Sequence, residues 1–235
     1  MMTNLFSTFD PSTSMNYSMN WTSTFIILIL FPYQYWMMSS RYTKLMFMMI
    51  NKLHQEFKTL LNKSNGLTLM TTSLFMFIIM NNMMGLLPYI FTSSSHMVFS
   101  LAMSLPLWMS ITMFGWIQKT QHMFTHLIPT GTPAILMPFM VCIETISNLI
   151  RPGSLAVRLT ANMITGHLLM TSLGSGMTNA DNIIVTIMMS MQITLMLFET
   201  AVATIQAYVF SILTTLYSSE VNYEKTKSPI SPSSP

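Results

Sequence analysis

One stretch of sequence decides the fold: residues 134–173 read AILMPFMVCIETISNLIRPGSLAVRLTANMITGHLLMTSL. These 40 residues contain no hydrophilic turn, and a second apolar stretch, 183–217, contains 35 residues. As continuous helices the two would be roughly 60 and 52 Å long, whereas a bilayer has a hydrocarbon core about 30 Å thick. We predict two long, strongly tilted helices that form a hairpin through residues 174–181. The alternative is two short spans in each stretch, because Arg151-Pro152-Gly153 could bend the first.

Composition places most of the chain in lipid. The 235 residues are 51% hydrophobic and only 7% charged, whereas a soluble domain has about 25% charged residues. The net charge of +3 is too small to indicate binding to nucleic acid. The single cysteine, Cys142, excludes an internal disulfide, and nothing in the sequence indicates a metal or cofactor.

The apolar segments predict an all-α integral membrane protein with one membrane domain, residues 1–223. Residues 43–62 carry apolar side chains at helical spacing among basic ones, which predicts an amphipathic helix on the membrane surface. The tail, 224–235, is rich in serine and proline and is expected to be disordered. We predict five transmembrane helices, at about 20–38, 67–91, 97–117, 134–173 and 183–217.

The basic residues predict the orientation of these spans. All lysines and arginines outside the spans fall in connectors on one side of the membrane, whereas the other side has only Asp10 and Asp181. By the positive-inside rule, the basic side is the one on which the protein is made. The N-terminus is therefore expected outside and the C-terminus inside.

Charged residues interrupt the first long helix. An ionised side chain at the centre of a bilayer costs about 2.5–3.5 kcal/mol on insertion scales. At 100° per residue, several polar side chains lie within about 40° of Arg158 on one face, and His167 lies on the opposite face. The members of this stripe are Glu144, Ser147, Arg151, Asn162 and Thr165. For Glu144 and Arg151, the alternative to a functional role is an ion pair that only holds helices together.

A second polar stripe follows the last long helix, where Gln192, Glu199 and Gln206 repeat every seven residues. Two such stripes facing each other would form a route for water or protons. Arginine cannot release its proton in a protein, so Arg158 can only set the potential or pair with a carboxylate. His167 and Glu199 carry the groups that can take up and release protons. This combination suits a device that conducts protons along two paths and blocks a direct leak between them.

At this point the sequence resembles a known family. Residues 150–167, IRPGSLAVRLTANMITGH, together with Glu199-Thr-Ala-Val-Ala-Thr-Ile-Gln206, look like the signature of ATP synthase subunit a in its insect mitochondrial form. The segments 133–147 and 217–222 are similar as well, and the resemblance extends over residues 1–223. It implies a chain without a catalytic site of its own that conducts protons in the membrane sector of the ATP synthase. It also implies the mitochondrial inner membrane, with the N-terminus in the intermembrane space and the C-terminus in the matrix.

The resemblance implies a role for each polar position. Arg158 would face the rotor ring of c subunits and attract its deprotonated carboxylates, and Asn162 and Gln206 would lie beside it. His167 and Glu199 would relay protons in the half-channel open to the intermembrane space. Glu144 would belong to the half-channel open to the matrix. The implied partners are the c-ring, the other membrane and peripheral-stalk subunits, and lipid.

A secondary transporter of ions or solutes is the main alternative. Such carriers usually contain internal repeats with discontinuous helices, and no repeat is visible in this sequence. A membrane electron carrier would need histidines paired across helices, whereas His96, His122 and His126 fall in predicted connectors. A purely structural scaffold would leave Arg158 unexplained.

Overall fold

The computed structural model describes residues 4–13, 17–32, 35–61, 65–128, 133, 135–179 and 181–222, and its elements are all helical. The all-α prediction is therefore confirmed. The predicted disordered tail, 224–235, lies outside the described residues. In chain order the elements are η1 (Leu5–Phe9), η2 (Met19–Phe25), α1 (Ile26–Leu30), α2 (Arg41–Leu60), α3 (Asn65–Gly85), η3 (Ser93–Ser95), α4 (Met97–Gln118), α5 (Thr120–His126), α6 (Met137–Gly176), η4 (Met177–Asn179) and α7 (Asn182–Asn222).

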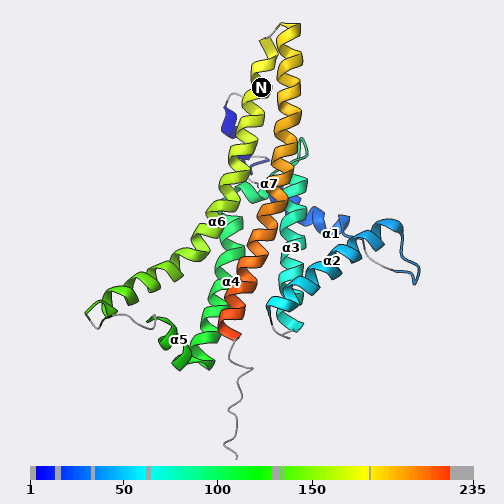
Figure 1. The fold of residues 1–235 in the computed structure, drawn as a ribbon. Helices are drawn as coiled ribbons and strands as arrows, with labels where there is room; N and C mark the ends of the chain where they lie inside the picture. Colours follow the sequence, from blue (N-terminus) through cyan, green and yellow to red (C-terminus); the bar gives the residue numbers. More distant parts are fainter. Residues whose placement is uncertain are drawn as a thin grey trace, which may run out of the picture.

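The two long helices form the predicted hairpin. α6 has 40 residues and α7 has 41, and η4 lies between them. Figure 1 shows them rising side by side to the turn, well beyond the ends of α3 and α4. The first part of α6 instead runs sideways across the base of the molecule. Pro152 lies inside α6, and a proline in a helix removes one backbone hydrogen bond and favours a bend.

Helices α3 and α4 pack against the lower half of the hairpin, α3 mainly on α7 and α4 mainly on α6. Their shared core is built around Ile78 of α3, Leu159 of α6 and Phe210 of α7, all of which are fully or almost fully buried. This packing fixes the stretch of α6 that carries Arg158, because Leu159 and Thr160 are buried directly after it. The core therefore positions the polar stripe along its length.

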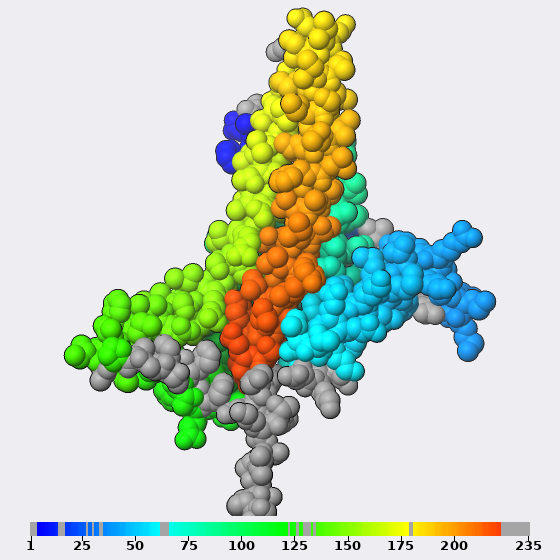
Figure 2. Space-filling view, viewed as in Figure 1, coloured from blue at the N-terminus to red at the C-terminus, as the bar shows by residue number. Residues whose placement is uncertain are grey.

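Helix α2 matches the amphipathic helix predicted at 43–62. It begins after Ser40, whose hydroxyl accepts a hydrogen bond from the backbone N–H of Thr43 at 3.3 Å, as is typical of an N-cap. Met46 and Phe57 are buried against the bundle, while most of the helix is exposed. Figure 2 shows α2 projecting sideways from the hairpin. Its predicted place on the membrane surface fits this projecting, amphipathic geometry.

The segment predicted as a first span, 20–38, is not one continuous helix. Its helical part, η2 and α1, ends at Leu30, and about 20 residues are needed to cross a bilayer. Pro32 follows two residues later, and proline restricts the residue before it and donates no backbone hydrogen bond. The span predicted at 67–91 likewise ends early, at Gly85, three residues before Pro88.

Three helices among the described residues are long and apolar enough to cross a membrane: Gly66–Gly85, Met97–Gln118 and Asn182–Val221. The charged and polar side chains of α6 keep it out of this group despite its length. The chain is thus a helical membrane protein, and the count of five spans stays a prediction.

Two polar contacts fix the lower half of α7 to its neighbours. The Lys119 ammonium, just after α4, donates a hydrogen bond to the backbone carbonyl of Val221 in the last turn of α7 at 3.0 Å. The last carbonyls of a helix lack partners within the helix and carry partial negative charge, so a lysine there is favourable. The Tyr208 hydroxyl donates to Glu56 of α2 at 3.3 Å.

Candidate functional site

The two predicted polar stripes meet at one clear point. The side-chain amide of Asn162 on α6 donates a hydrogen bond to Oε1 of Gln206 on α7 at 3.2 Å. Gln206 is buried and Asn162 is partly buried. Since the two residues are 44 positions apart in the sequence, this bond shows that the stripes of α6 and α7 face each other, as predicted from helical periodicity.

Glu199 lies in the interior, 5% exposed, between α6 and α7. Its carboxylate packs directly on Gly166 of α6, where any side chain would collide with it. Both carboxylate oxygens are buried without a hydrogen-bond partner among the described residues, and so is Nε2 of His167. Such atoms are rare in proteins because leaving them unsatisfied is costly. Two neighbouring unsatisfied groups that can bind protons therefore indicate a site with a role beyond packing.

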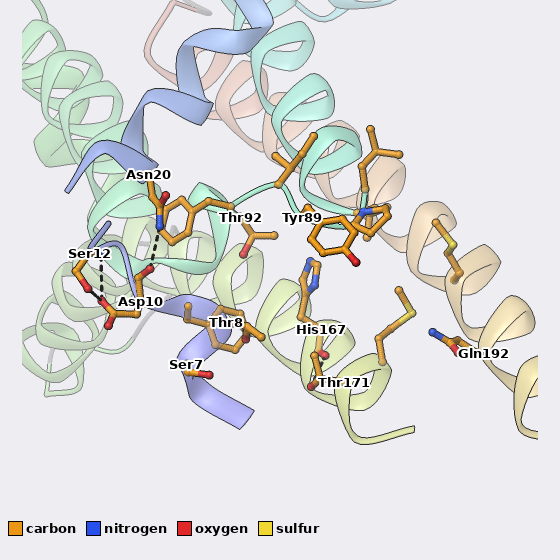
Figure 3. Close-up of a pocket in the computed structure, with 18 residues that line it drawn as sticks. Ser7, Thr8, Asp10, Ser12, Asn20, Tyr89, Thr92, His167, Thr171 and Gln192 are labelled. Atoms are coloured by element: carbon orange, nitrogen blue, oxygen red, sulfur yellow. Dashed lines mark hydrogen bonds between the residues drawn. The ribbon is translucent and has the colours of Figure 1, made fainter. Parts of the chain in front are cut away.

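A cavity of about 690 Å³ opens beside His167. Figure 3 shows His167 and Thr171 of α6 facing the end of α3 and the N-terminal segment, with Gln192 of α7 farther along. The N-terminal segment supplies polar walls and the α3–α4 connection supplies mostly apolar ones. The residues from these two segments are Ser7, Thr8, Phe9, Asp10, Ser12 and Asn20, and Leu86, Leu87, Pro88, Tyr89, Ile90, Phe91 and Thr92.

Arg158 lies below this cavity on the exposed face of α6. It is nine residues before His167, about 14 Å along the helix axis, and takes part in neither of the ion pairs found among the described residues. Val157 beside it, and Leu169 and Ile205 elsewhere on the hairpin, are exposed apolar side chains. Among the described residues, Arg158 is thus an exposed arginine of α6 that belongs to neither ion pair.

Arg151, by contrast, has three partners. Its guanidinium lies 3.7 Å from Glu144 and 3.6 Å from Glu220, and 5.2 Å from the ring centre of Tyr217. The pairing of Arg151 with Glu144, one of the two readings left open by the sequence, is therefore present. Glu220 and Tyr217 were missed, because their meeting with Arg151 depends on the register of α7 against α6.

The site residues thus follow one another down the hairpin from the turn. His167, Glu199 and the cavity come first, then the Asn162–Gln206 pair and Arg158, and finally the cluster of Arg151 with Glu144 at the base. Glu144 is 14 residues from Arg158, about 21 Å along an α-helix. The isolated arginine therefore lies between two separate groups of titratable side chains.

Comparison with known proteins shows the family of the chain. Residues 17–219 match the family model described as ATP synthase A chain. The chain is similar to "ATP synthase subunit a" of Drosophila melanogaster, with 60% identity over 224 residues that cover 94% of this chain and all of that relative. It is 59% identical to the proteins of the same name from Anopheles gambiae and Aedes aegypti, over 226 residues and with the same coverage. From its sequence, its helical membrane fold and these relatives, the chain belongs to the ATP synthase A chain family.

Proposed function

We propose that this chain is the proton-translocating stator subunit of the membrane sector of an ATP synthase. The observation that carries the proposal is the position of Arg158, exposed on α6 between two groups of titratable residues. A charged side chain inside the bilayer is costly and usually functional. A charge that cannot be deprotonated separates two proton paths without itself conducting.

In this proposal the first half-channel contains the cavity, His167 and Glu199. A proton enters the cavity from the intermembrane space, passes His167 and Glu199, and protonates a carboxylate on a rotating ring of partner helices. The packing of Glu199 on Gly166 supports placing both groups in one path, because Gly166 is the residue before His167 on α6. Both residues are on the side of Arg158 that faces the hairpin turn.

The second half-channel would begin at Arg158 and lead towards Glu144. A ring carboxylate that reaches Arg158 pairs with the guanidinium, and its proton leaves towards the matrix. Asn162 and Gln206, hydrogen-bonded to each other beside the arginine, keep this stretch polar. Each proton that crosses 100 mV supplies about 2.3 kcal/mol, so several protons are needed for each ATP.

The partner that fits the surface around Arg158 is a ring of apolar helices, each with one carboxylate. The exposed apolar side chains of the hairpin, such as Val157, Leu169 and Ile205, suit such helices or lipid. We place the chain in the mitochondrial inner membrane, with five spans, the N-terminus in the intermembrane space and the C-terminus in the matrix. Other membrane and peripheral-stalk subunits would hold it against the ring.

The test is Arg158→Gln in the assembled complex, with ATP-driven proton pumping measured in inner-membrane vesicles. We expect pumping to be lost while the amount of assembled complex stays nearly unchanged, because Arg158 takes part in no ion pair among the described residues. Arg151→Gln is the matched control, since it removes the same charge two turns away on the same helix. It should lower stability yet keep pumping per assembled complex. Normal pumping by Arg158→Gln would refute the proposal.

A further inference from the structure

The cavity beside His167 has a polar mouth made by the N-terminal segment. Phe9 places its ring edge-on against the His167 ring, with centroids 6.3 Å apart, and η1 packs on α6. Asp10 follows directly and is exposed. Figure 3 shows Asp10 and Ser12 at one end of the lining residues, with His167 farther in. The cavity therefore connects an exposed carboxylate to the partly buried His167, whose Nε2 is buried.

Asp10 is held in place by its own loop. Its Oδ1 accepts hydrogen bonds from the backbone N–H of Ser12 at 3.0 Å and from the Ser12 hydroxyl at 2.8 Å. Its backbone carbonyl accepts from the Asn20 side chain at 3.2 Å. The bonds from the Ser12 backbone and side chain lower the pKa of Asp10 below its usual value. Asp10 is thus a fixed negative charge at neutral pH and not a group that relays protons.

The fixed charge that lines the cavity is negative. Among the described residues that line it, the titratable ones are Asp10, Tyr89 and His167, and none is a lysine or arginine. A carboxylate at the mouth of a cleft that lacks a compensating cation attracts cations and raises their local concentration. In water, one charge acting over about 5–10 Å changes the local proton concentration roughly two- to fourfold.

We propose that Asp10 is the proton-collecting carboxylate at the outer mouth of the half-channel that leads to His167. This inference rests on the proposed function, because it assumes that protons enter through the cavity. It adds a residue of the N-terminal segment to a pathway whose other members lie on the two long helices. The role is electrostatic: Asp10 raises the proton concentration at the mouth of the cavity and stays ionised itself.

The experiment uses Asp10→Asn in the assembled complex. Asparagine can still accept the hydrogen bonds from Ser12, so the substitution removes little besides the charge. ATP synthesis is measured in mitoplasts, whose outer face is exposed to the medium, with membrane potential and matrix pH clamped while the medium pH varies. At about pH 8.5, where protons are scarce, we expect synthesis to be two- to fourfold slower than in the native complex. At about pH 6.5 the two rates should agree, and Asp10→Glu should restore the native rate at both.

Asp181→Asn is the matched control. Asp181 is an exposed carboxylate just before α7 that does not line the cavity, and its substitution should leave the rate unchanged. If Asp10→Asn behaves like Asp181→Asn at high pH, the inference is wrong, and a parallel loss of synthesis in Arg158→Gln would show that the proposed function still holds. Normal ATP synthesis in Arg158→Gln would instead refute the proposed function.

A second measurement needs no variant and decides the matter if Asp10→Asn fails to assemble. Raising the ionic strength from about 0.01 to 0.15 M shortens the Debye length from about 30 to about 8 Å. At high pH the native rate should then fall by up to two- to fourfold. A native rate that does not respond to salt would overturn the inference.

Discussion

Gly166→Ala tests whether the position of the Glu199 carboxylate matters for proton transfer. A methyl group at Gly166 would lie 3.1 Å from Cγ of Glu199 and would overlap its carboxylate. Ordinary contacts between carbon atoms are about 3.5–4.0 Å, so the carboxylate must swing away by about 1 Å. The Glu199 side chain is flexible, and an off-rotamer angle costs only about 0.5–1.5 kcal/mol.

The expected result is therefore a functional loss with little loss of stability. A misplacement of about 1 Å can lower a rate by about 100-fold, so we expect ATP-driven proton pumping to fall about 10- to 100-fold. The complex should assemble normally on native gels, and its melting temperature should drop by only a few degrees. Pumping in inner-membrane vesicles, divided by the amount of assembled complex, gives the measurement.

Gly174→Ala provides the matched control on the same helix. A methyl group there meets nothing within 4 Å, so pumping and stability should both stay at native levels. If Gly166→Ala pumps as well as Gly174→Ala, the exact place of the Glu199 carboxylate does not limit proton transfer. That outcome would refute the argument from packing, and the role of Glu199 would have to be assigned on other grounds.

Three further predictions concern the contacts that hold α7. Arg151→Gln removes both ion pairs and should lower the free energy of unfolding by about 1 kcal/mol, because these partly exposed pairs are weak. The melting temperature of the purified complex should fall less for Glu220→Gln, which removes one pair. Equal falls in the two variants would contradict this. Lys119→Met removes the hydrogen bond to the last turn of α7, worth about 1 kcal/mol, and should speed hydrogen exchange there; unchanged exchange would mean that the turn is held otherwise. Tyr208→Phe removes an exposed bond to Glu56 and should change the melting temperature by no more than the experimental error, whereas a drop of several degrees would show that this contact anchors α2.

Helical periodicity predicted the part of the site that lies within single helices. The stripe on α6 and the seven-residue repeat on α7 placed Asn162 and Gln206 on facing surfaces, and their hydrogen bond confirms it. The lengths of the apolar stretches predicted the hairpin, since no polar turn divides either one. Both arguments use only local geometry, which a sequence specifies well.

Contacts that depend on register or on distant segments could not be predicted. The meeting of Arg151 with Tyr217 and Glu220 requires the exact offset of two antiparallel helices. The cavity requires the N-terminal segment to fold back on α6, for which the sequence offers no periodic signal. The helical part of the predicted first span ends at Leu30, two residues before Pro32, a local break that hydropathy alone does not reveal.

The exposed position of Arg158 also bears on how such a subunit is made. Arg158 is exposed and belongs to neither ion pair of the described residues, and an arginine at the centre of a bilayer costs about 2.5–3.5 kcal/mol or more. An acidic neighbour removes that penalty, so a newly inserted copy gains stability when it docks. Arg158 would then make the stability of the chain depend on assembly. In cells without a c-ring, the native chain should be degraded faster than the Arg158→Leu variant. Pulse-chase lifetimes of the unassembled chain would show the opposite order if this reasoning fails.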